Sequence, residues 1–171
     1  MKSILALRVI GLLVTLSIAT ASRAQPLSKS QSDPQPDAAM LQPVHELVEF
    51  MRALPPAMHP KFFAPHVCII ENFMPFLFCE SDAALSWETG FRQHAAEEQL
   101  AQLALTFGEA HDYSRAGKRV YFSLPTTWTG RTHGRLFVEH GAWAFVLERE
   151  SSGWRIAGYG WGVTNYSESA Q

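Results

Sequence analysis

The stretch that decides the fold is GAWAFVLERESSGWRIAGYGWGV, residues 141–163. It holds an apolar run, then turn residues at 150–153, and then a second run that opens with Gly-Trp-Arg-Ile at 153–156. Two such runs around a glycine-containing turn predict antiparallel strands joined by a hairpin. Two further runs precede them, so residues 103–163 predict a meander of four long strands. A meander of this length curls around other parts of the chain, and the aromatic-rich segment before it is available to fill the curve.

The four expected strands are 101–113, 118–128, 133–149 and 154–163, with a bulge at Gly141. Turns centred on residues 115–116 and 130–131 put His111 opposite Val120 and Phe122 opposite Glu139. On the other face, Tyr121 is expected opposite His140. A shift of one residue in either register would exchange the two faces. The first face then carries Phe107, Glu109, His111, Val120, Phe122, Leu124, Phe137 and Glu139.

The segment before the meander predicts helices and one short hairpin. Apolar residues recur at three- and four-residue spacing between Leu41 and Met51, which indicates an amphipathic helix that ends before Pro55-Pro56. A short second helix or a turn is expected at 58–65 and a hairpin at 67–79. Ser81-Asp82 can cap a third helix, because both side chains favour helix N-termini.

Cys68 and Cys79 are the two cysteines of the chain. If the hairpin reverses at Phe73-Met74, they lie directly opposite each other, with Cβ atoms close enough to be bridged. The spacing therefore predicts a disulfide, and two buried free thiols are the alternative. Two sulfurs without further ligands do not indicate a metal site.

The N-terminus has the pattern of a secretory signal peptide over residues 1–24. Lys2 and Arg8 precede an uncharged run at 9–21, and Ser22-Arg23-Ala24 offers small residues for cleavage. An uncleaved membrane anchor is the alternative, although the run is short for a bilayer. Cleavage removes three cations and leaves a net charge of −5 with His neutral, and this charge argues against nucleic acid or an anionic membrane as partner. The expected location is the periplasm or the medium.

The remaining boundaries follow from composition. Residues 25–38 are rich in Gln, Ser, Pro and Asp and predict a flexible linker. A single domain is expected over 39–165, followed by a flexible tail at 166–171.

The order of helix, short helix, hairpin, helix and four strands resembles the nuclear transport factor 2 and ketosteroid isomerase superfamily. The strand at 141–147 and the Gly-Trp-Arg-Ile run at 153–156 carry the resemblance. It implies an α+β fold: a cystatin-like cone in which three N-terminal helices pack on a strongly curved antiparallel sheet, with a β-hairpin between helices two and three. It also implies that the sheets of two copies pair, so a homodimer is expected.

One departure bears on mechanism. In the isomerases of this superfamily the first helix carries a Tyr acid and the first hairpin an Asp base. Here the first helix has no Tyr and offers His45 and Glu49, and the hairpin offers Glu71 and Asn72 near its turn.

The candidate catalytic residues are Glu139, Glu109 and His111. Carboxylates among Phe and Leu side chains have a raised pKa, which suits a general acid or base near neutral pH. Solvated acids on an exposed face are the alternative. The candidate ligand-binding residues are His45, Trp87, Tyr121, Phe122, Phe137, His140 and Trp161.

Three functions remain open at this point. The leading prediction is an exported domain that binds a small apolar molecule in its cone, without metal or other cofactor. The first alternative is a proton-transfer enzyme similar to isomerases, cyclases or dehydratases. The second alternative is a dimeric interaction or inhibitory module whose own Phe and Trp side chains fill the cone. Two convergent titratable groups in an open pocket would favour the enzyme.

Overall fold

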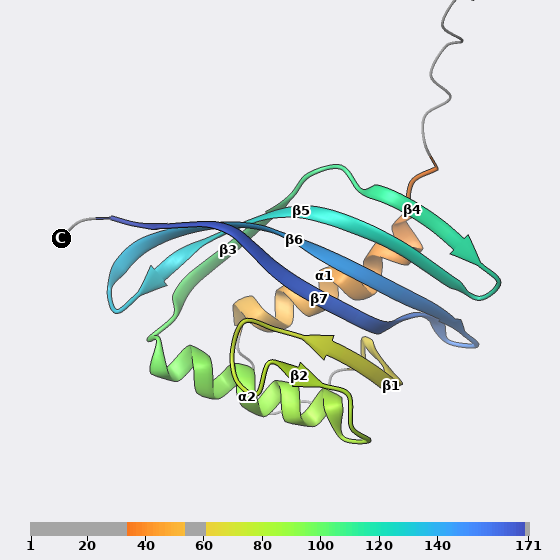
Figure 1. Ribbon diagram of the computed structural model, residues 1–171, viewed down its shortest axis with the longest axis horizontal. Coiled ribbons are helices and arrows are strands. Elements are labelled where there is room, and N and C mark those ends of the chain that lie inside the picture. Colours follow the sequence, from red (N-terminus) through yellow and green to blue (C-terminus); the bar gives the residue numbers. More distant parts are fainter. Residues whose placement is uncertain (1–33, 54–60, 170–171) are drawn as a thin grey trace, which may run out of the picture. The chain divides into compact units, whose positions relative to one another are not determined.

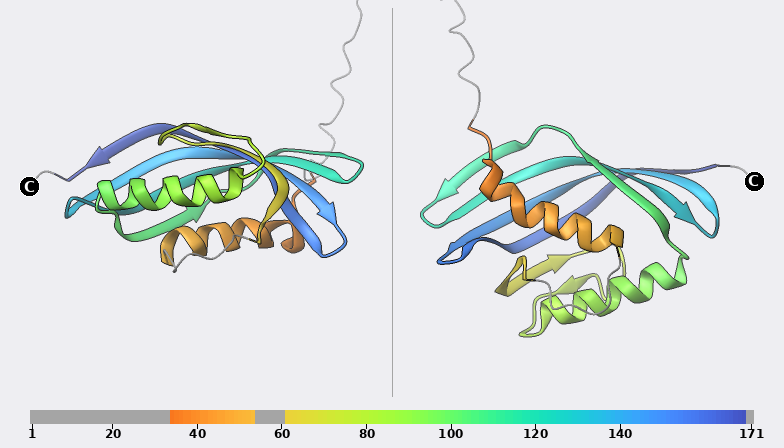
Figure 2. Two further views of the ribbon diagram at one scale, coloured as in Figure 1. Left: turned by 90° about the horizontal axis from the view of Figure 1, so that it is seen from below. Right: turned by 180° about the vertical axis from the view of Figure 1, so that it is seen from behind.

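The computed structural model describes residues 34–53 and 61–169. Two helices and seven strands follow one another along this part of the chain (Figure 1). Both helices lie on the same side of a curved, open sheet (Figure 2). None of the helices in the described ranges has the length and apolar character that crossing a membrane requires. In chain order the elements are α1 (Ala38–Ala53), β1 (Phe63–Ile70), β2 (Leu77–Phe78), α2 (Ala83–Glu97), β3 (Ala101–Phe107), β4 (His111–Ala116), β5 (Arg119–Thr132), β6 (Arg135–Glu150) and β7 (Gly153–Glu168).

The sheet has the strand order β2-β1-β7-β6-β5-β3, and β4 also pairs with β5. Its centre is the meander of β5, β6 and β7, in which every second residue faces the helices because strand side chains alternate between faces. On β5 these inward residues include Val120, Phe122 and Leu124, all buried. The predicted long antiparallel strands at the C-terminal end are therefore confirmed.

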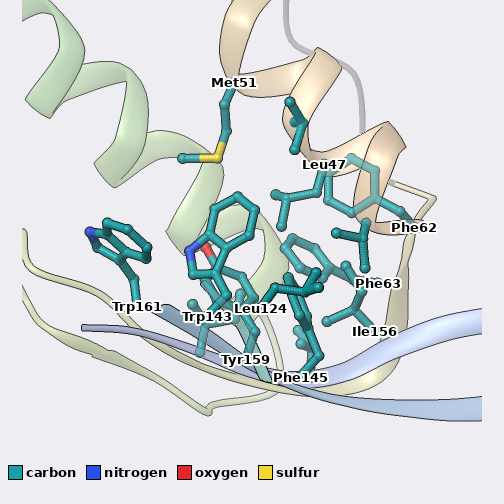
Figure 3. Close-up of a cluster of buried hydrophobic side chains, with 14 of the residues drawn as sticks. Leu47, Met51, Phe62, Phe63, Leu124, Trp143, Phe145, Ile156, Tyr159 and Trp161 are labelled. Carbon is teal, nitrogen blue, oxygen red and sulfur yellow. The ribbon is translucent and has the colours of Figure 1, made fainter. Parts of the chain in front are cut away.

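The core forms where the helices cover this inward face. Figure 3 shows Leu47 and Met51 of α1 opposite Trp143 and Phe145 of β6. The apolar spacing that predicted the first helix supplies its buried stripe of Met40, Val44, Leu47, Val48 and Met51. α2 begins directly after Asp82, where a helix start was predicted, although no side-chain hydrogen bond caps it, and it buries Trp87, Phe91 and Ala95.

Two features of the predicted architecture are wrong. The sheet is mixed, because β1 runs parallel to β7 while its other pairs are antiparallel. A parallel pair needs a long crossover, and here the whole of 71–152 provides it. The described residues contain two helices where three were predicted. Of the segment 58–65, expected as a short helix or a turn, residues 58–60 lie outside the described ranges, residues 61–62 form a turn and residues 63–65 begin β1.

The expected strand at 101–113 is interrupted. β3 ends at Phe107 and β4 begins at His111, and Asp112 has a positive φ of 56°. Glu109 and His111 are exposed at this break, although they were predicted on the inward face. At the other end of the meander, β7 continues through Glu168, past the predicted strand end and into the predicted tail.

Both predicted registers in the meander are wrong. The turns lie at Gly117-Lys118 and His133-Gly134, where both glycines have positive φ, and not at 115–116 and 130–131. A residue in the left-handed region suits a two-residue hairpin turn, whereas Gly130 lies inside the ladder opposite Phe137. Beside the two turns the pairing is shifted by four and by six residues, both even, so the inward set of β5 and β6 stays on the same face. His111 lies beyond a register irregularity in β4, and its partner is displaced by three residues. The observed pairs are His111 with Ser123, Arg115 with Val120, Tyr121 with Val146, Phe122 with Phe145, Leu124 with Trp143 and Thr127 with His140.

A bulge lies beside Gly141, as predicted, but its extra residue is on the partner strand and not on the strand of Gly141. The β6–β7 register shifts between His140 and Gly141, so that Thr164 of β7 is the extra residue. A Cβ on Gly141 would collide with the carbonyl oxygen of Gly162 and lie 2.8 Å from Cζ2 of Trp161. The close approach of the two strands at the bulge therefore requires glycine.

We expect Gly141→Ala to lower the free energy of unfolding by about 1–3 kcal/mol, because the added methyl must displace backbone and the Trp161 ring. Urea unfolding of the variant measures the loss. Gly160→Ala is the matched control, since its Cβ would meet Ile70 at an ordinary 3.7 Å. Equal stability of the two variants would contradict the explanation.

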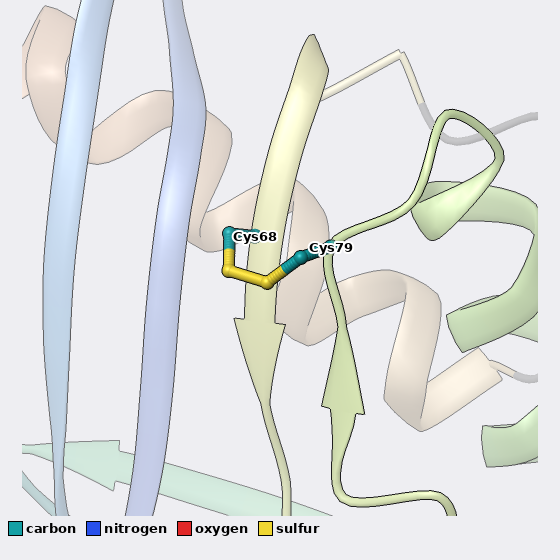
Figure 4. Close-up of a disulfide and its surroundings, with 2 residues drawn as sticks. All are labelled: Cys68 and Cys79. Atoms are coloured by element: carbon teal, nitrogen blue, oxygen red, sulfur yellow. A yellow bond between two sulfur atoms is a disulfide. The ribbon is translucent and has the colours of Figure 1, made fainter.

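The predicted disulfide is also confirmed. Cys68 on β1 is bonded to Cys79 just after β2, with Cα atoms 4.2 Å apart (Figure 4). The adjacent pair Ile69 and Phe78 sets this register, as the reversal near Phe73 predicted. The bond holds together a hairpin that has only two residue pairs in its ladder.

Removing this cross-link in Cys68→Ala/Cys79→Ala should cost about 3 kcal/mol of unfolding free energy, since the unfolded chain gains the entropy of an open loop. Denaturant unfolding with and without dithiothreitol measures the difference. Reductant should destabilise the wild-type protein and leave the double variant unchanged. An insensitive wild-type protein would refute the prediction.

Candidate functional site

A cavity of about 260 Å³ lies between the helices, the hairpin and the inward face of the sheet. Its walls are mainly aromatic and aliphatic, and of its carboxylates Glu71 is buried and Glu139 is half-buried. Among the described residues that line it, none is Lys or Arg. The lining residues are Met51, Glu71, Asn72, Phe73, Phe91, His94, Glu98, Leu100, Leu103, Trp128, Thr132, Phe137, Glu139, Trp143, Trp161 and Tyr166.

Glu71 is the most enclosed acid of the site, with 5% of its surface exposed. It follows β1, on the same face as the buried Val67 and Ile69, so strand alternation turns it inward. The indole Nε1 of Trp87 donates to its Oε1 at 3.1 Å, and the hydroxyl of Tyr159 donates to the same oxygen. The carboxyl group is therefore fixed by two side-chain donors, and neither carries a positive charge.

This environment raises the pKa of Glu71 to about 7. Burial is the largest cause, because a carboxylate loses its hydration, and the nearby Glu139 adds repulsion. The hydrogen bonds from Tyr159, Trp87 and the Asn72 backbone oppose the rise by stabilising the charged form. Both protonation states of Glu71 are consequently available near neutral pH.

Glu139 is the second carboxylate of the cavity. It lies half-buried on β6, and the indole Nε1 of Trp161 donates to its Oε1 at 2.8 Å. Burial raises its pKa, and the Trp161 hydrogen bond opposes the rise. His94 of α2 also lines the cavity, stacked on Phe73, and burial lowers its pKa.

The predicted site residues are distributed unevenly. Glu139, Phe137 and Trp161 line the cavity. Trp87 is buried behind it as a donor to Glu71, and Phe122 is part of the core. The structure does not bring the other predicted residues to the cavity: His45, Glu109, His111, Tyr121 and His140 are exposed.

Glu71 is the functional candidate that the predicted set of site residues lacks. The signal was present, because Val67, Ile69 and Glu71 alternate along one strand. An acid at the end of a strand, next to a turn, can equally well face solvent. The inward orientation of Glu71 follows from its hydrogen bonds with Tyr159 and Trp87, which the sequence pattern does not reveal. Within the described ranges, no three His, Cys, Asp or Glu side chains are grouped as metal ligands.

Comparisons with known proteins show the fold. No protein-family profile and no curated protein sequence matches the chain. Among solved structures, hexachlorocyclohexane dehydrochlorinase LinA-type3 from Novosphingobium barchaimii is similar with a TM-score of 0.64 and 8% identity, over 78% of this chain and 89% of that one.

Two further solved structures are similar to this chain. One, described as a putative ketosteroid isomerase from Shewanella frigidimarina, gives a TM-score of 0.56 and 18% identity, over 74% of this chain and 96% of that one. The other, a nuclear transport factor 2-like superfamily protein from Salmonella enterica, gives a TM-score of 0.59 and 12% identity, over 72% of this chain and 87% of that one. At these identities the comparisons establish fold and not activity. The chain has the nuclear transport factor 2-like fold, as the resemblance implied.

The raised pKa of Glu71 makes stability depend on pH. The pKa of Glu71 is 4.5 in the unfolded chain and about 7 in the folded protein, so between these pH values the folded state binds one more proton. The contribution of Glu71 to the free energy of unfolding is therefore complete below pH 4.5 and is lost as the pH rises to about 7. We expect Glu71 to contribute a loss of about 3 kcal/mol between pH 4.5 and 7.5. Urea unfolding at several pH values measures it.

Glu71→Gln is the matching variant, because an amide keeps an acceptor for Tyr159 and does not ionise. It should remove this part of the pH dependence and be more stable than the wild-type protein at pH 8. Parallel pH profiles for the two proteins would show that Glu71 does not titrate as described.

Proposed function

We propose that the cavity binds a small, largely apolar molecule and that Glu71 transfers a proton to or from it. The observation that carries the proposal is a buried carboxyl group, oriented by Trp87 and Tyr159, in the wall of an apolar cavity. A general base works best when its pKa lies near the working pH, and that of Glu71 is about 7.

The geometry assigns separate tasks to the two oxygens of Glu71. Both side-chain donors reach Oε1, so this oxygen anchors the group. We assign the transferred proton to Oε2. Burial raises the pKa of Tyr159 well above its usual value, so its hydroxyl keeps its proton and remains a donor to the carboxylate.

Glu139 supplies the second titratable group. It lines the same cavity, and its charge raises the pKa of Glu71, so the two groups share one electrostatic environment. Of the two, Glu71 is the more deeply buried, so it is the group that takes up and releases a proton near neutral pH. In this proposal Glu71 exchanges the proton with the bound molecule, and the negative charge of Glu139 helps to keep the pKa of Glu71 raised.

This proposal favours the enzyme over simple ligand carriage because two titratable groups converge on the cavity. The proposal still includes the binding of an apolar molecule, because aromatic side chains line the cavity. An interaction module whose own side chains fill the cone agrees less well with a cavity of about 260 Å³. Structures of this fold carry names that denote elimination and isomerisation, reaction classes that need a proton transfer.

Two expectations from the sequence remain predictions. Export is supported by the Cys68–Cys79 disulfide, because such bonds persist in oxidising compartments. The signal peptide at 1–24 lies outside the described residues. The homodimer also stays a prediction, which the mass of the purified protein in solution would test.

A carbon acid of suitable size tests the proton transfer. We expect the protein to accelerate deuterium exchange at the acidic C–H of 2-tetralone in D₂O, followed by proton NMR. kcat/KM should rise with pH through about 7 and level off above it, since the base must be ionised. Glu71→Gln should reduce the rate at least about 100-fold, within the usual contribution of a general base.

Glu46→Gln is the control for this experiment. Glu46 is an exposed acid on α1 that does not line the cavity, so its replacement should leave exchange unchanged. If 2-tetralone binds while wild-type protein and Glu71→Gln exchange it at the same rate, the assignment of the base is wrong and ligand binding alone remains.

A further inference from the structure

The indole Nε1 of Trp143 has an unmet hydrogen bond. Within the described residues it is the single buried side-chain nitrogen or oxygen for which no partner is present. An indole N–H can only donate, and leaving a buried donor unpaired costs about 1–3 kcal/mol. Native proteins rarely keep such a group, and its retention calls for a partner that the chain does not itself supply.

The ring of Trp143 is held so that it cannot turn to find a partner. It is 1% exposed and packs edge to face against Trp128 and Trp161, with ring centroids 6.0 and 5.8 Å away. Phe145 and Tyr159 lie against it at 5.4 and 6.0 Å. The direction of the N–H bond is therefore set by the packing of the core.

Trp143 is one of the residues that line the cavity. Trp143 contacts Tyr159, which donates to Glu71, and Trp161, which donates to Glu139. In Figure 3 the nitrogen of Trp143 is on the edge of the ring that faces Trp161, another residue of the cavity wall.

We infer that Trp143 Nε1–H anchors the ligand, and that the ligand is an apolar molecule carrying a hydrogen-bond acceptor such as a carbonyl oxygen. The inference rests on the proposed function, because it requires a ligand in the cavity. It adds a direction to binding: the acceptor points to Trp143, and the carbon next to it lies between Glu71 and Glu139. A site built around a donor discriminates strongly against molecules that leave it unpaired.

A matched pair of probes tests this inference. Indane and 1-indanone have nearly the same shape and differ in one carbonyl group. Calorimetry gives their dissociation constants for the wild-type protein and for Trp143→Phe. Because the variant enlarges the cavity for both probes alike, the ratio of the two constants isolates the N–H contact. We expect the preference for 1-indanone to fall about tenfold in Trp143→Phe, the worth of one neutral hydrogen bond.

Trp154→Phe is the control, because Trp154 is buried outside the cavity, against Arg115 and Arg149. It should leave the ratio unchanged. Trp143→3-benzothienylalanine replaces N–H by sulfur at nearly constant volume and keeps the test decisive if Trp143→Phe fails to fold. In a proton–nitrogen-15 correlation NMR spectrum of the wild-type protein, the proton signal of the Trp143 indole N–H should move downfield when 1-indanone is added. It should not move when indane is added.

The outcomes separate the two proposals. If both probes bind, the ratio is the same in both Trp143 variants and the wild-type protein, and the indole signal does not move, then the donor role of Trp143 is refuted while ligand binding stands. If neither probe binds the wild-type protein, the proposed function and the donor role are both refuted. A tenfold change of the ratio with the downfield shift supports ligand binding in the cavity and the donor role of Trp143.

Discussion

The parallel pairing of β1 with β7 is the constraint on which the candidate site depends. It places Ile69 opposite Tyr159 and Ile70 opposite Gly160, so that the next residue, Glu71, reaches the Tyr159 hydroxyl from 88 positions away in the sequence. The same pairing places the hairpin of β1 and β2 next to β7, so that Asn72 and Phe73 of its turn line the cavity. Without this pairing, the Tyr159 hydroxyl would not reach the Glu71 carboxylate.

The aromatic core then gives the acid its properties. Trp87 is fully buried and contacts Phe50, Phe63, Phe91 and Tyr159. These rings exclude water, which raises the pKa of Glu71, yet Trp87 and Tyr159 each add a donor that holds the carboxylate in place. The two effects oppose each other, and their balance leaves Glu71 half-ionised near neutral pH. An apolar residue at position 71 would be easier to bury than Glu71. A buried carboxyl group that costs stability is typical of a functional position.

The sequence allowed the central sheet to be predicted well because its signals are local. The alternation at 119–132 and the glycine turn before Trp154 depend on neighbouring residues, and each survives in the structure. The Cys68–Cys79 bond was predictable for the same reason, since a short hairpin brings its two strands together. The registers were predicted less well: Gly130 and Gly134 both suit a turn in the sequence, and only the left-handed backbone at Gly134 with the packing of Gly130 against Leu103 decides between them.

By itself, the sequence determined the meander, the first and last helices, the bulge beside Gly141 and a strand face that carries Phe137 and Glu139 together. These features follow from periodicity, turn chemistry and the absence of a side chain, which are properties of short segments. The sequence left open whether this face is the inward one and whether Trp161 shares it. Only the tertiary structure decided that β1 joins β7 in parallel, that Glu71 faces inward, and that Trp143 has no partner for its N–H. Each of these depends on which distant segments meet, because burial and hydrogen bonding are properties of the assembled core and no short segment contains them.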